Sequence, residues 1–376
     1  MTRTLVVALL TLGDPGRLTG GYLYHRRIAD LAPRSGARIE FVSFPERPFP
    51  LAVRDAPAVL RRARSAGAHA LVIDSIVAAL LGPWLSLQRP HLPLIGMLHQ
   101  PPGGIDHGHL RTAVQAYLDR LAYRRARRLL VASDLLVDQL RAAGMPPDRI
   151  RVVPPGRDVA ATTGAAAGDL RRGRRAALLC VGNWVERKGI HSLLDAFARL
   201  PPDAATLHLA GDDRVEPRYS ARVRARLSHT DLAARVVVHG PLTVDEVAAL
   251  YEAADAFVLP SLKEPYGTVY GEAMAYGLPV VGWRAGNLTY LADDGCEGLL
   301  VPPGDVAGLS GALQRLADDE ALLRRLGAAA RRRALGRPTW EETAAHFYAE
   351  VRDVVRGTKG RRRRSPVSDP GSIAGY

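Results

Sequence analysis

The chain has 376 residues, of which 47% are hydrophobic and 24% charged, and its formal net charge is +13. This length predicts about two domains, and the composition excludes fibrous and wholly disordered classes. The two cysteines, Cys180 and Cys296, lie far apart with no CxxC spacing, which argues against a disulfide framework or a zinc site and favours a reducing, cytoplasmic location. The positive charge favours polyanionic partners such as nucleotide phosphates, anionic lipid or nucleic acid.

Short apolar runs alternate with helix-length amphipathic segments in the first half of the chain. The opening run ends in Gly, Asp and Pro without a cleavage signal, so it predicts a first strand rather than a secretory leader. Strands separated by helix-length segments indicate βαβ units and a largely parallel sheet. We therefore predict an α/β Rossmann-like domain over residues 1–160. The runs that predict its strands are TLVVALLTL, ARIEFVSF, HALVID, LPLIGMLHQ, RLLVAS and IRVVPP.

The alternation stops and then restarts in the middle of the chain. Residues 157–175 are small and then basic, which is typical of a linker. From AALLCVGNW onward the same alternation predicts a second Rossmann-like domain over residues 161–339. Ligands of open parallel sheets bind at the carboxyl ends of the strands, so we expect two domains that face a cleft carrying the functional site.

The end of the chain predicts one more helix and a basic tail. Apolar residues from Trp340 to Val354 recur at helical spacing, so we predict a helix over residues 340–356. Residues 357–376 combine an arginine run with Gly, Ser and Pro, a composition that predicts disorder.

A further basic cluster lies in the helical pattern AVQAYLDRLAYRRARRLL. It consists of Arg124, Arg125, Arg127 and Arg128. One interpretation is a solvated helix face, and the other is a patch that contacts anionic lipid headgroups at the inner face of a membrane. The basic residues form no recognisable nucleic-acid module, so we expect no specific nucleic-acid partner.

The segment VGNWVERKGIHSLLDAF predicts a phosphate-binding loop. Gly182 and Asn183 follow an apolar strand, and Arg187 and Lys188 then precede a helix. Cations beside the free amides of a helix N-terminus favour an anion. The alternative is that both cations only solvate a turn.

The segment KEPYGTVYGEAMAYG carries two glutamates with different positions. Glu264 lies between a strand and a helix start near Gly267 and Thr268, so it can accept hydrogen bonds from a polyol. Glu272 lies two helical turns on and could hold another hydroxyl pair, such as a ribose diol. With the preceding loop, the second helix start predicts a site for a diphosphate.

These segments resemble a known family. EPYG at 264–267, EAMA at 272–275 and GLPVV at 277–281 are similar to the EPFG…EAMA.G.PVV signature of the group 1 (family 4) retaining glycosyltransferases. The resemblance extends in the same order across most of the chain. Its other members are the Gly20-Gly21 pair, VASDLLVDQLRAAGMPPDRIRVVPPGRD, VGNWVERKG and GLLVPPGD.

The resemblance implies a GT-B architecture, with the acceptor in the first domain, the nucleotide-sugar in the second and the last helix returning to the first domain. The catalytic residues that it implies are His99, Glu264 and Lys188: Glu264 would contact the transferred sugar, Lys188 the diphosphate, and His99 would lie beside the reacting carbon. The remaining implied donor-site residues are Gly182, Asn183, Arg187, Tyr266, Gly267, Thr268, Val269 and Glu272, with Glu272 on the ribose. Gly20 and Gly21 would form the phosphate loop of the acceptor domain.

One position departs from the family pattern. Asn183 stands where the family usually has an arginine, and the neighbouring Arg187 is the candidate to replace that cation.

The implied reaction is a front-face transfer from a nucleotide-diphosphate sugar to an acceptor hydroxyl, with retention. It needs no nucleophilic carboxylate. We expect no metal, because Asp212-Asp213 is a weak candidate, and no cofactor, because the nucleotide-sugar is a substrate. The acceptor is left open among a glycan, a lipid-linked sugar and a small molecule. The alternatives are a sugar phosphorylase or nucleotide-sugar epimerase on the same fold, or a non-enzymatic nucleotide- or polyanion-binding protein.

Overall fold

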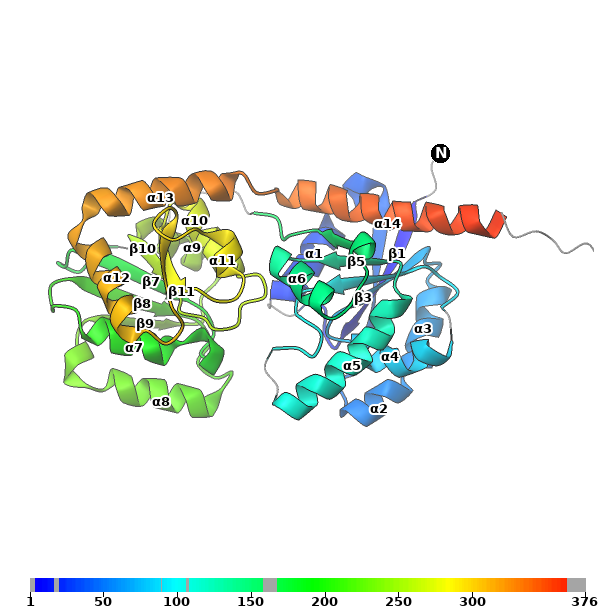
Figure 1. Cartoon of the computed structure of the whole chain (residues 1–376), viewed down its shortest axis with the longest axis horizontal. Coiled ribbons are helices and arrows are strands. Elements are labelled where there is room, and N and C mark those ends of the chain that lie inside the picture. Colours follow the sequence, from blue (N-terminus) through cyan, green and yellow to red (C-terminus); the bar gives the residue numbers. More distant parts are fainter. Residues whose placement is uncertain (1–3, 17–19, 89, 106–107, 158–167, 364–376) are drawn as a thin grey trace, which may run out of the picture. The chain divides into compact units, whose positions relative to one another are not determined.

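The chain folds into two compact units (Figure 1). The computed structural model describes residues 4–16, 20–88, 90–105, 108–157 and 168–363. The first unit comprises the described parts of residues 1–131, 139–153 and 343–376, and the second comprises those of 132–138 and 154–342. The predicted boundary at residue 160, like most of the predicted linker, lies outside the described residues.

The first unit is built on a six-stranded parallel sheet in the order β2-β1-β3-β4-β5-β6. Strands β3 and β4 are buried along their whole length, which explains why they appear in the sequence as continuous apolar runs. The strands are β1 (Leu5–Leu12), β2 (Ala37–Phe44), β3 (Ala70–Asp74), β4 (Leu94–Leu98), β5 (Arg128–Val131) and β6 (Ile150–Val152).

Helices connect these strands in the βαβ manner that the sequence predicts. Helix α4 is apolar almost all round and buries most of its length, whereas the longer α5 is largely polar. The helical elements are α1 (Gly20–Asp30), η1 (Pro33–Ser35), α2 (Phe49–Arg54), α3 (Ala56–Ser65), α4 (Ala78–Leu87), α5 (His109–Arg125), α6 (Asp134–Ala142) and η2 (Pro147–Arg149).

The last helix, α14 (Trp340–Arg363), belongs to the first unit from Thr343 onward. The hydroxyl of Tyr348 donates a hydrogen bond of 2.8 Å to the carbonyl of Ile28, near the end of α1. This confirms the predicted return of the helix to the first domain. The prediction of disorder from residue 357 is wrong for 357–363, which continue the helix, and residues 364–376 lie outside the described residues.

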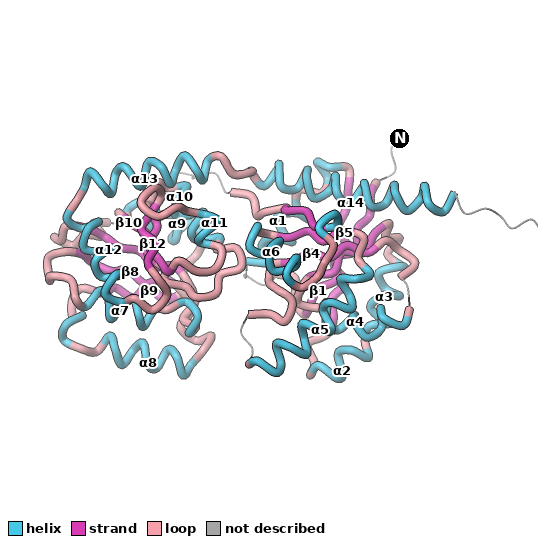
Figure 2. Tube along the Cα trace, viewed as in Figure 1, coloured by secondary structure: helices cyan, strands magenta, loops and turns pink. Residues whose placement is uncertain are grey.

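The second unit repeats the architecture with a six-stranded parallel sheet in the order β12-β11-β10-β7-β8-β9 (Figure 2). Two parallel sheets with crossover helices confirm the predicted α/β fold class with two Rossmann-like domains. The strands are β7 (Ala176–Val181), β8 (Ala205–Ala210), β9 (Val236–Gly240), β10 (Ala256–Val258), β11 (Val280–Trp283) and β12 (Gly298–Val301).

Several helices of the second unit begin at side-chain caps. Thr243 and Glu246 form a reciprocal capping box at the start of α9, and Asp305 caps α12. The helical elements are η3 (Glu186–Lys188), α7 (Ile190–Ala198), α8 (Pro217–Leu227), η4 (Thr230–Leu232), α9 (Val244–Ala253), α10 (Thr268–Ala275), α11 (Leu288–Leu291), α12 (Val306–Asp318) and α13 (Glu320–Leu335).

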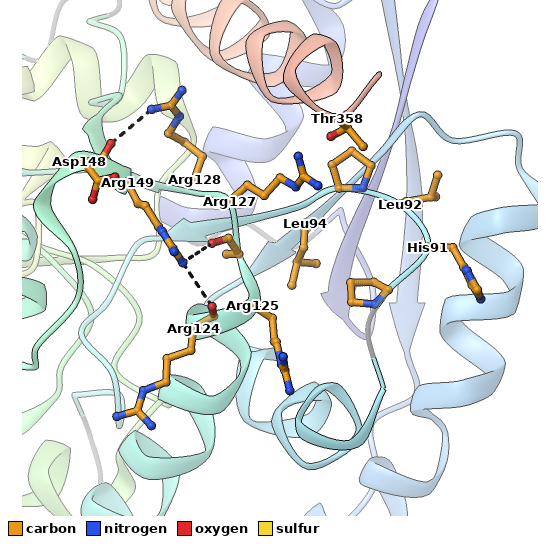
Figure 3. A pocket seen from close by; sticks show the side chains of 13 residues that line it. His91, Leu92, Leu94, Arg124, Arg125, Arg127, Arg128, Asp148, Arg149 and Thr358 are labelled. Atoms are coloured by element: carbon orange, nitrogen blue, oxygen red, sulfur yellow. Dashed lines mark hydrogen bonds between the residues drawn. The ribbon is translucent and has the colours of Figure 1, made fainter. Parts of the chain in front are cut away.

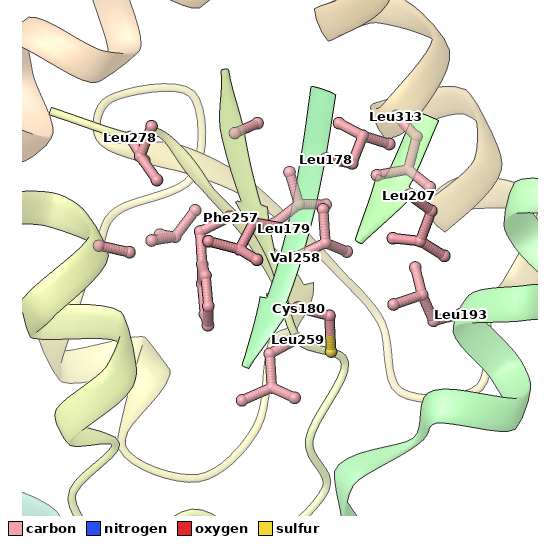
Figure 4. Packing of buried hydrophobic residues seen from close by; sticks show 14 of the residues in the cluster. Leu178, Leu179, Cys180, Leu193, Leu207, Phe257, Val258, Leu259, Leu278 and Leu313 are labelled. Atoms are coloured by element: carbon pink, nitrogen blue, oxygen red, sulfur yellow. The ribbon is translucent and has the colours of Figure 1, made fainter. Parts of the chain in front are cut away.

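The core of the second unit lies around its two central strands, β7 and β10. Leu178, Leu179 and Phe257 are fully buried and pack with Leu193 of α7 and Leu313 of α12 (Figure 4). A rigid core under the carboxyl ends of these two strands holds the loops that follow them in fixed positions.

Candidate functional site

The loop after β7 carries the predicted phosphate-binding cations. Gly182 directly follows the strand, and a Cβ at this position would lie 3.6 Å from Cδ of Lys188, so the lysine stem lies along the glycine. The side-chain oxygen of Asn183 accepts a 3.2 Å hydrogen bond from the amide of Asp212, which ties the loop to the one after β8. Asn183 therefore supports the loop rather than supplying a charge.

The loop after β10 joins the loop after β7 through backbone contacts. The carbonyl of Arg187 accepts hydrogen bonds from the amide of Leu262 at 2.8 Å and from the hydroxyl of Ser261 at 3.1 Å. Gly189 has a φ of 69°, and a Cβ there would lie 2.3 Å from the carbonyl oxygen of Pro260. The close approach of the two loops thus depends on a glycine.

An ion pair between Lys188 and Glu264 lies where these loops meet. The Lys188 Nζ is 2.5 Å from Oε2 of Glu264, and the lysine is only 8% exposed. Nη1 of Arg187 lies 3.6 Å from the same oxygen and donates to the carbonyl of Lys263 at 3.1 Å. Both cations thus contact the Glu264 carboxylate, and the lysine ammonium retains two further donors for a ligand.

The start of α10 places backbone donors beside this pair. Its N-cap, Gly267, has a φ of 81°, and a Cβ there would lie 3.1 Å from Cγ of Glu264. Within the part of the chain that the structure describes, the amides of Thr268 and Val269 have no carbonyl partner. Unpaired amides at a helix N-terminus favour an anion.

The other predicted helix start contributes less. The first amides of α7 are partly used within the protein, because the amide of His191 donates to the hydroxyl of Tyr219 at 3.0 Å. The anion-binding potential of the second unit is therefore concentrated at Lys188 and the start of α10.

Tyr266 and Glu272 lie on either side of the α10 N-terminus in sequence and have different surroundings. The hydroxyl of Tyr266 donates to the carbonyl of Pro155 at 3.3 Å and accepts from Arg337 at 3.1 Å. Glu272 accepts a 3.1 Å hydrogen bond from the hydroxyl of Tyr251 in α9. The structure thus brings Glu272 onto the same helix as the free amides, while the Tyr266 hydroxyl is engaged with the segment around Pro155.

The first unit has its own cluster at the carboxyl ends of its strands. His99 follows β4, and its Nε2 lies 3.0 Å from Nε2 of His25 in α1. A Cβ on Gly21 would lie 3.4 Å from the His99 ring, so the start of α1, which includes Gly20, lies against His99. Behind His25, its Nδ1 lies 3.7 Å from the carboxylate of Asp74 at the end of β3.

Burial keeps the two histidines of this cluster neutral. Burial lowers the pKa of His25 to about 3, and burial with the neighbouring His25 lowers the pKa of His99 to about 3. Burial also raises the pKa of Asp74, against the opposing effects of His99 and of hydrogen bonds from Ile76, Ser75 and Thr11. His99 is therefore a neutral imidazole, whose Nε2 shares one proton with that of His25.

His25 and Asp74 were not predicted as site residues from the sequence. Asp74 ends the apolar run HALVID, and a polar residue at the carboxyl end of a buried strand was the available signal. His25 lies four residues after Gly21, on the buried side of α1 with Tyr24 and Ile28. Their meeting with His99 depends on the neighbouring positions of β3, β4 and α1.

The Asp212-Asp213 pair is occupied by arginines. Asp212 pairs with Arg214 at 2.9 Å, and Asp213 pairs with Arg224. Among the described residues, no group of three His, Cys, Asp or Glu side chains is placed to hold a metal ion.

Family models match both halves of the chain. The model described as glycosyl transferase 4-like domain matches residues 2–156, and the one described as glycosyl transferases group 1 matches residues 175–319. The second match contains the Lys188 and Glu264 loops, and the first contains the histidine cluster.

Curated relatives carry glycosyltransferase names. Glycogen synthase of Mycobacterium tuberculosis is 31% identical over 284 residues, which are 73% of this chain and 67% of the relative. D-inositol 3-phosphate glycosyltransferase of Streptomyces bingchenggensis is 30% identical over 304 residues, 75% of this chain and 66% of the relative. The chain thus spans about two thirds of the length of these relatives.

Solved structures share the fold. Sucrose-phosphate synthase from Thermosynechococcus elongatus matches with a TM-score of 0.79 and 22% identity, over 94% of this chain and 100% of that chain. Anabaena HepE, solved with UDP and glucose, matches with a TM-score of 0.76 and 22% identity, over 93% and 99%. With the matched motifs and relatives, these findings show that the chain belongs to the group 1, family 4, glycosyltransferases and has their GT-B fold.

Proposed function

We propose that this protein is a retaining glycosyltransferase that moves a sugar from a nucleotide-diphosphate sugar to an acceptor hydroxyl. The observation that carries the proposal is the ion pair of Lys188 and Glu264 beside the N-terminus of α10. Cation, carboxylate and free amides at one place suit a donor that has an anionic leaving group next to a polyol. The solved HepE complexes with UDP and UDP-glucose support a donor of this class.

The donor diphosphate is assigned to the cations and amides. Lys188, with Arg187 beside it, offers ammonium and guanidinium donors, and the amides of Thr268 and Val269 offer two more. In the transfer, negative charge grows on the departing phosphate, so donors already in place stabilise the transition state more than the ground state.

The two glutamates are assigned to the two polyols of the donor. Glu264, ionised and fixed by its cations, accepts hydrogen bonds from hydroxyls of the transferred sugar. Glu272 accepts from the ribose, with Tyr251 orienting its carboxylate. Tyr266 acts through its backbone, because its carbonyl accepts from Asn287 at 2.7 Å and so helps to fix the loop before α10.

The first unit is assigned to the acceptor. A neutral His99 beside Gly21 can hydrogen-bond a sugar hydroxyl without taking its proton, which suits a front-face reaction where the leaving phosphate accepts the proton from the attacking hydroxyl. Retention follows, because attack and departure occur on the same face of the sugar.

The test is a ligand screen followed by a stereochemical measurement. Nucleotide-sugars are screened by thermal shift, since a ligand that binds only the folded protein raises its melting temperature. The best donor is then combined with free glycan, lipid-linked and small-molecule acceptors, and the anomeric proton of the product is read by NMR. An inverted product contradicts retention. Turnover that needs inorganic phosphate, or that isomerises the donor alone, identifies a phosphorylase or an epimerase instead.

A further inference from the structure

A basic cavity lies in the first unit, outside the site assigned above. It has a volume of about 750 Å³, within the usual range of small-molecule sites. Five arginines line it, together with one acidic residue, Asp148 (Figure 3). The arginines are Arg124 and Arg125 at the end of α5, Arg127 and Arg128 at the start of β5, and Arg149 just before β6.

The cavity and the histidine cluster lie at opposite ends of the strands of one sheet. The lining includes Leu94 and Arg128, which begin β4 and β5, whereas His99 follows the last residue of β4. The two ends of the five-residue strand β4 are roughly 16 Å apart. A ligand in the cavity would therefore be distinct from the acceptor assigned to His99.

One of the arginines is neutralised by the last helix. Arg128 lies 3.0 Å from Glu350 and 2.6 Å from Asp353, both on α14. These two carboxylates balance its charge, so Arg128 is explained by the packing of α14 on the first unit.

Two others are held by carbonyl groups and keep their charge. Arg125 donates to the carbonyls of Leu85 and Ser86, each at 2.9 Å, at the end of α4. Arg149 donates to the carbonyls of Arg124 and Ala126, each at 3.4 Å, at the end of α5. A carbonyl orients a guanidinium without neutralising it, so both are ordered positive charges.

The remaining two have no such structural explanation. Arg124 and Arg127 are exposed, and within the described residues neither has an ion-pair partner. Four uncompensated guanidinium groups therefore surround the cavity, against the single carboxylate of Asp148. Repulsion among them costs stability unless an anion is present.

We propose that this cavity binds a phosphate-bearing anion. Guanidinium groups match phosphate oxygens in bidentate geometry, and two of the four are already ordered, so a ligand would pay little of their ordering entropy. The same chemistry is offered by the headgroup of an anionic phospholipid and by a soluble phosphate compound.

The test compares Arg124→Gln/Arg127→Gln with a control of equal charge, Arg54→Gln/Arg111→Gln. Arg54 and Arg111 are also exposed in the first unit, and Arg111 lies at the opposite end of α5 from the cavity. All are full-length chains, so the arginine-rich tail contributes equally. Binding is measured to vesicles of phosphatidylcholine with and without phosphatidylglycerol, and to inorganic pyrophosphate by calorimetry.

We expect the cavity variant to lose about ten- to thirtyfold in anion binding and the control variant to change little. A loss confined to phosphatidylglycerol vesicles identifies a phospholipid headgroup, and a loss confined to pyrophosphate identifies a soluble ligand. Equal losses in both variants, or no loss in either, overturn the proposal. Unchanged melting temperatures verify that the exposed substitutions leave the fold intact.

Discussion

The loops after β4 and after β7 each follow a central strand of a six-stranded parallel sheet, yet their chemistry is opposite. In the first unit, burial makes His25 and His99 neutral. In the second, Lys188 and Arg187 both pair with the carboxylate of Glu264. The difference shows that the shared architecture supplies the position of a site, while the residues that end each strand decide whether the site is charged.

The charged side of this comparison is tested most strongly by Glu264→Gln. The amide keeps the shape of the side chain but removes the ionised acceptor and leaves Lys188 without its counter-ion. We expect kcat/KM for sugar transfer to fall by roughly 10²- to 10³-fold, with the fold retained. The measurement is steady-state kinetics with circular dichroism of the variant.

A matched control is Glu252→Gln on the exposed surface of α9 in the same unit. It removes the same charge without touching Lys188. Near-normal kcat/KM for Glu264→Gln, or equal losses in both variants, would contradict the role given to Glu264.

Lys188→Ala tests whether Lys188 binds the diphosphate of the donor and not its nucleoside. The ammonium lies at the end of β7 beside the α10 amides. Its loss should therefore weaken the binding of a nucleoside diphosphate by about 10- to 100-fold and the binding of the free nucleoside much less. Calorimetric titrations with the two ligands measure this difference. The control is Lys263→Ala, which removes an exposed lysine one residue from Glu264. If Lys188→Ala weakened the binding of both ligands equally, Lys188 would be a structural residue.

The local pattern of the chain was enough to predict the strands and helices, because alternation of apolar runs and amphipathic segments is set by near neighbours. It also placed Lys188 and Glu264 at strand ends. The local pattern does not predict the contact between them. The two residues are 76 positions apart and meet because β7 and β10 are adjacent in the sheet. Before the structure, the two residues were linked by the expectation that both loops bind one diphosphate and by the family resemblance, and neither predicted their direct ion pair.

Two features were not predictable from local composition. The meeting of His25, Asp74 and His99 depends on the neighbouring positions of α1, β3 and β4, which no local pattern encodes. The helical conformation of residues 357–363 was also missed, because their Gly and Arg content favours disorder, whereas the helix to which they belong is anchored by buried Val351 and Val354.

The neutrality of His25 and His99 predicts how folding stability depends on pH. The pKa values of His25 and His99 are lowered to about 3 from an ordinary value of 6.5. Between these values the unfolded chain binds more protons than the folded one, so folding stability is present above pH 6.5 and is lost as the pH falls toward 3. Each histidine contributes at most about 1.4 kcal/mol per pH unit in this window.

The raised pKa of Asp74 acts in the opposite direction, because the folded protein binds that proton above the pH at which the unfolded chain releases it. The histidines are therefore observed directly, by ¹⁵N NMR of labelled protein at pH 5. Both should show the shifts of neutral rings, and the same residues in urea should show protonated ones. A protonated His99 in the folded protein would remove the contrast between the two units.

The smallest expected effect concerns the packing of α14 on the first unit. The hydroxyl of Tyr348 donates to the carbonyl of Ile28, so α14 satisfies a backbone acceptor near the end of α1 in the first unit. Tyr348→Phe should reduce the stability of that unit by about 1 kcal/mol, the usual contribution of a buried hydrogen bond. Hydrogen exchange measures this loss as faster exchange of first-unit amides, with those of the second unit unchanged. Tyr117→Phe removes a hydroxyl from an exposed position on α5 and should have no effect. Equal acceleration in both units would mean that α14 stabilises the whole chain and not the first unit in particular.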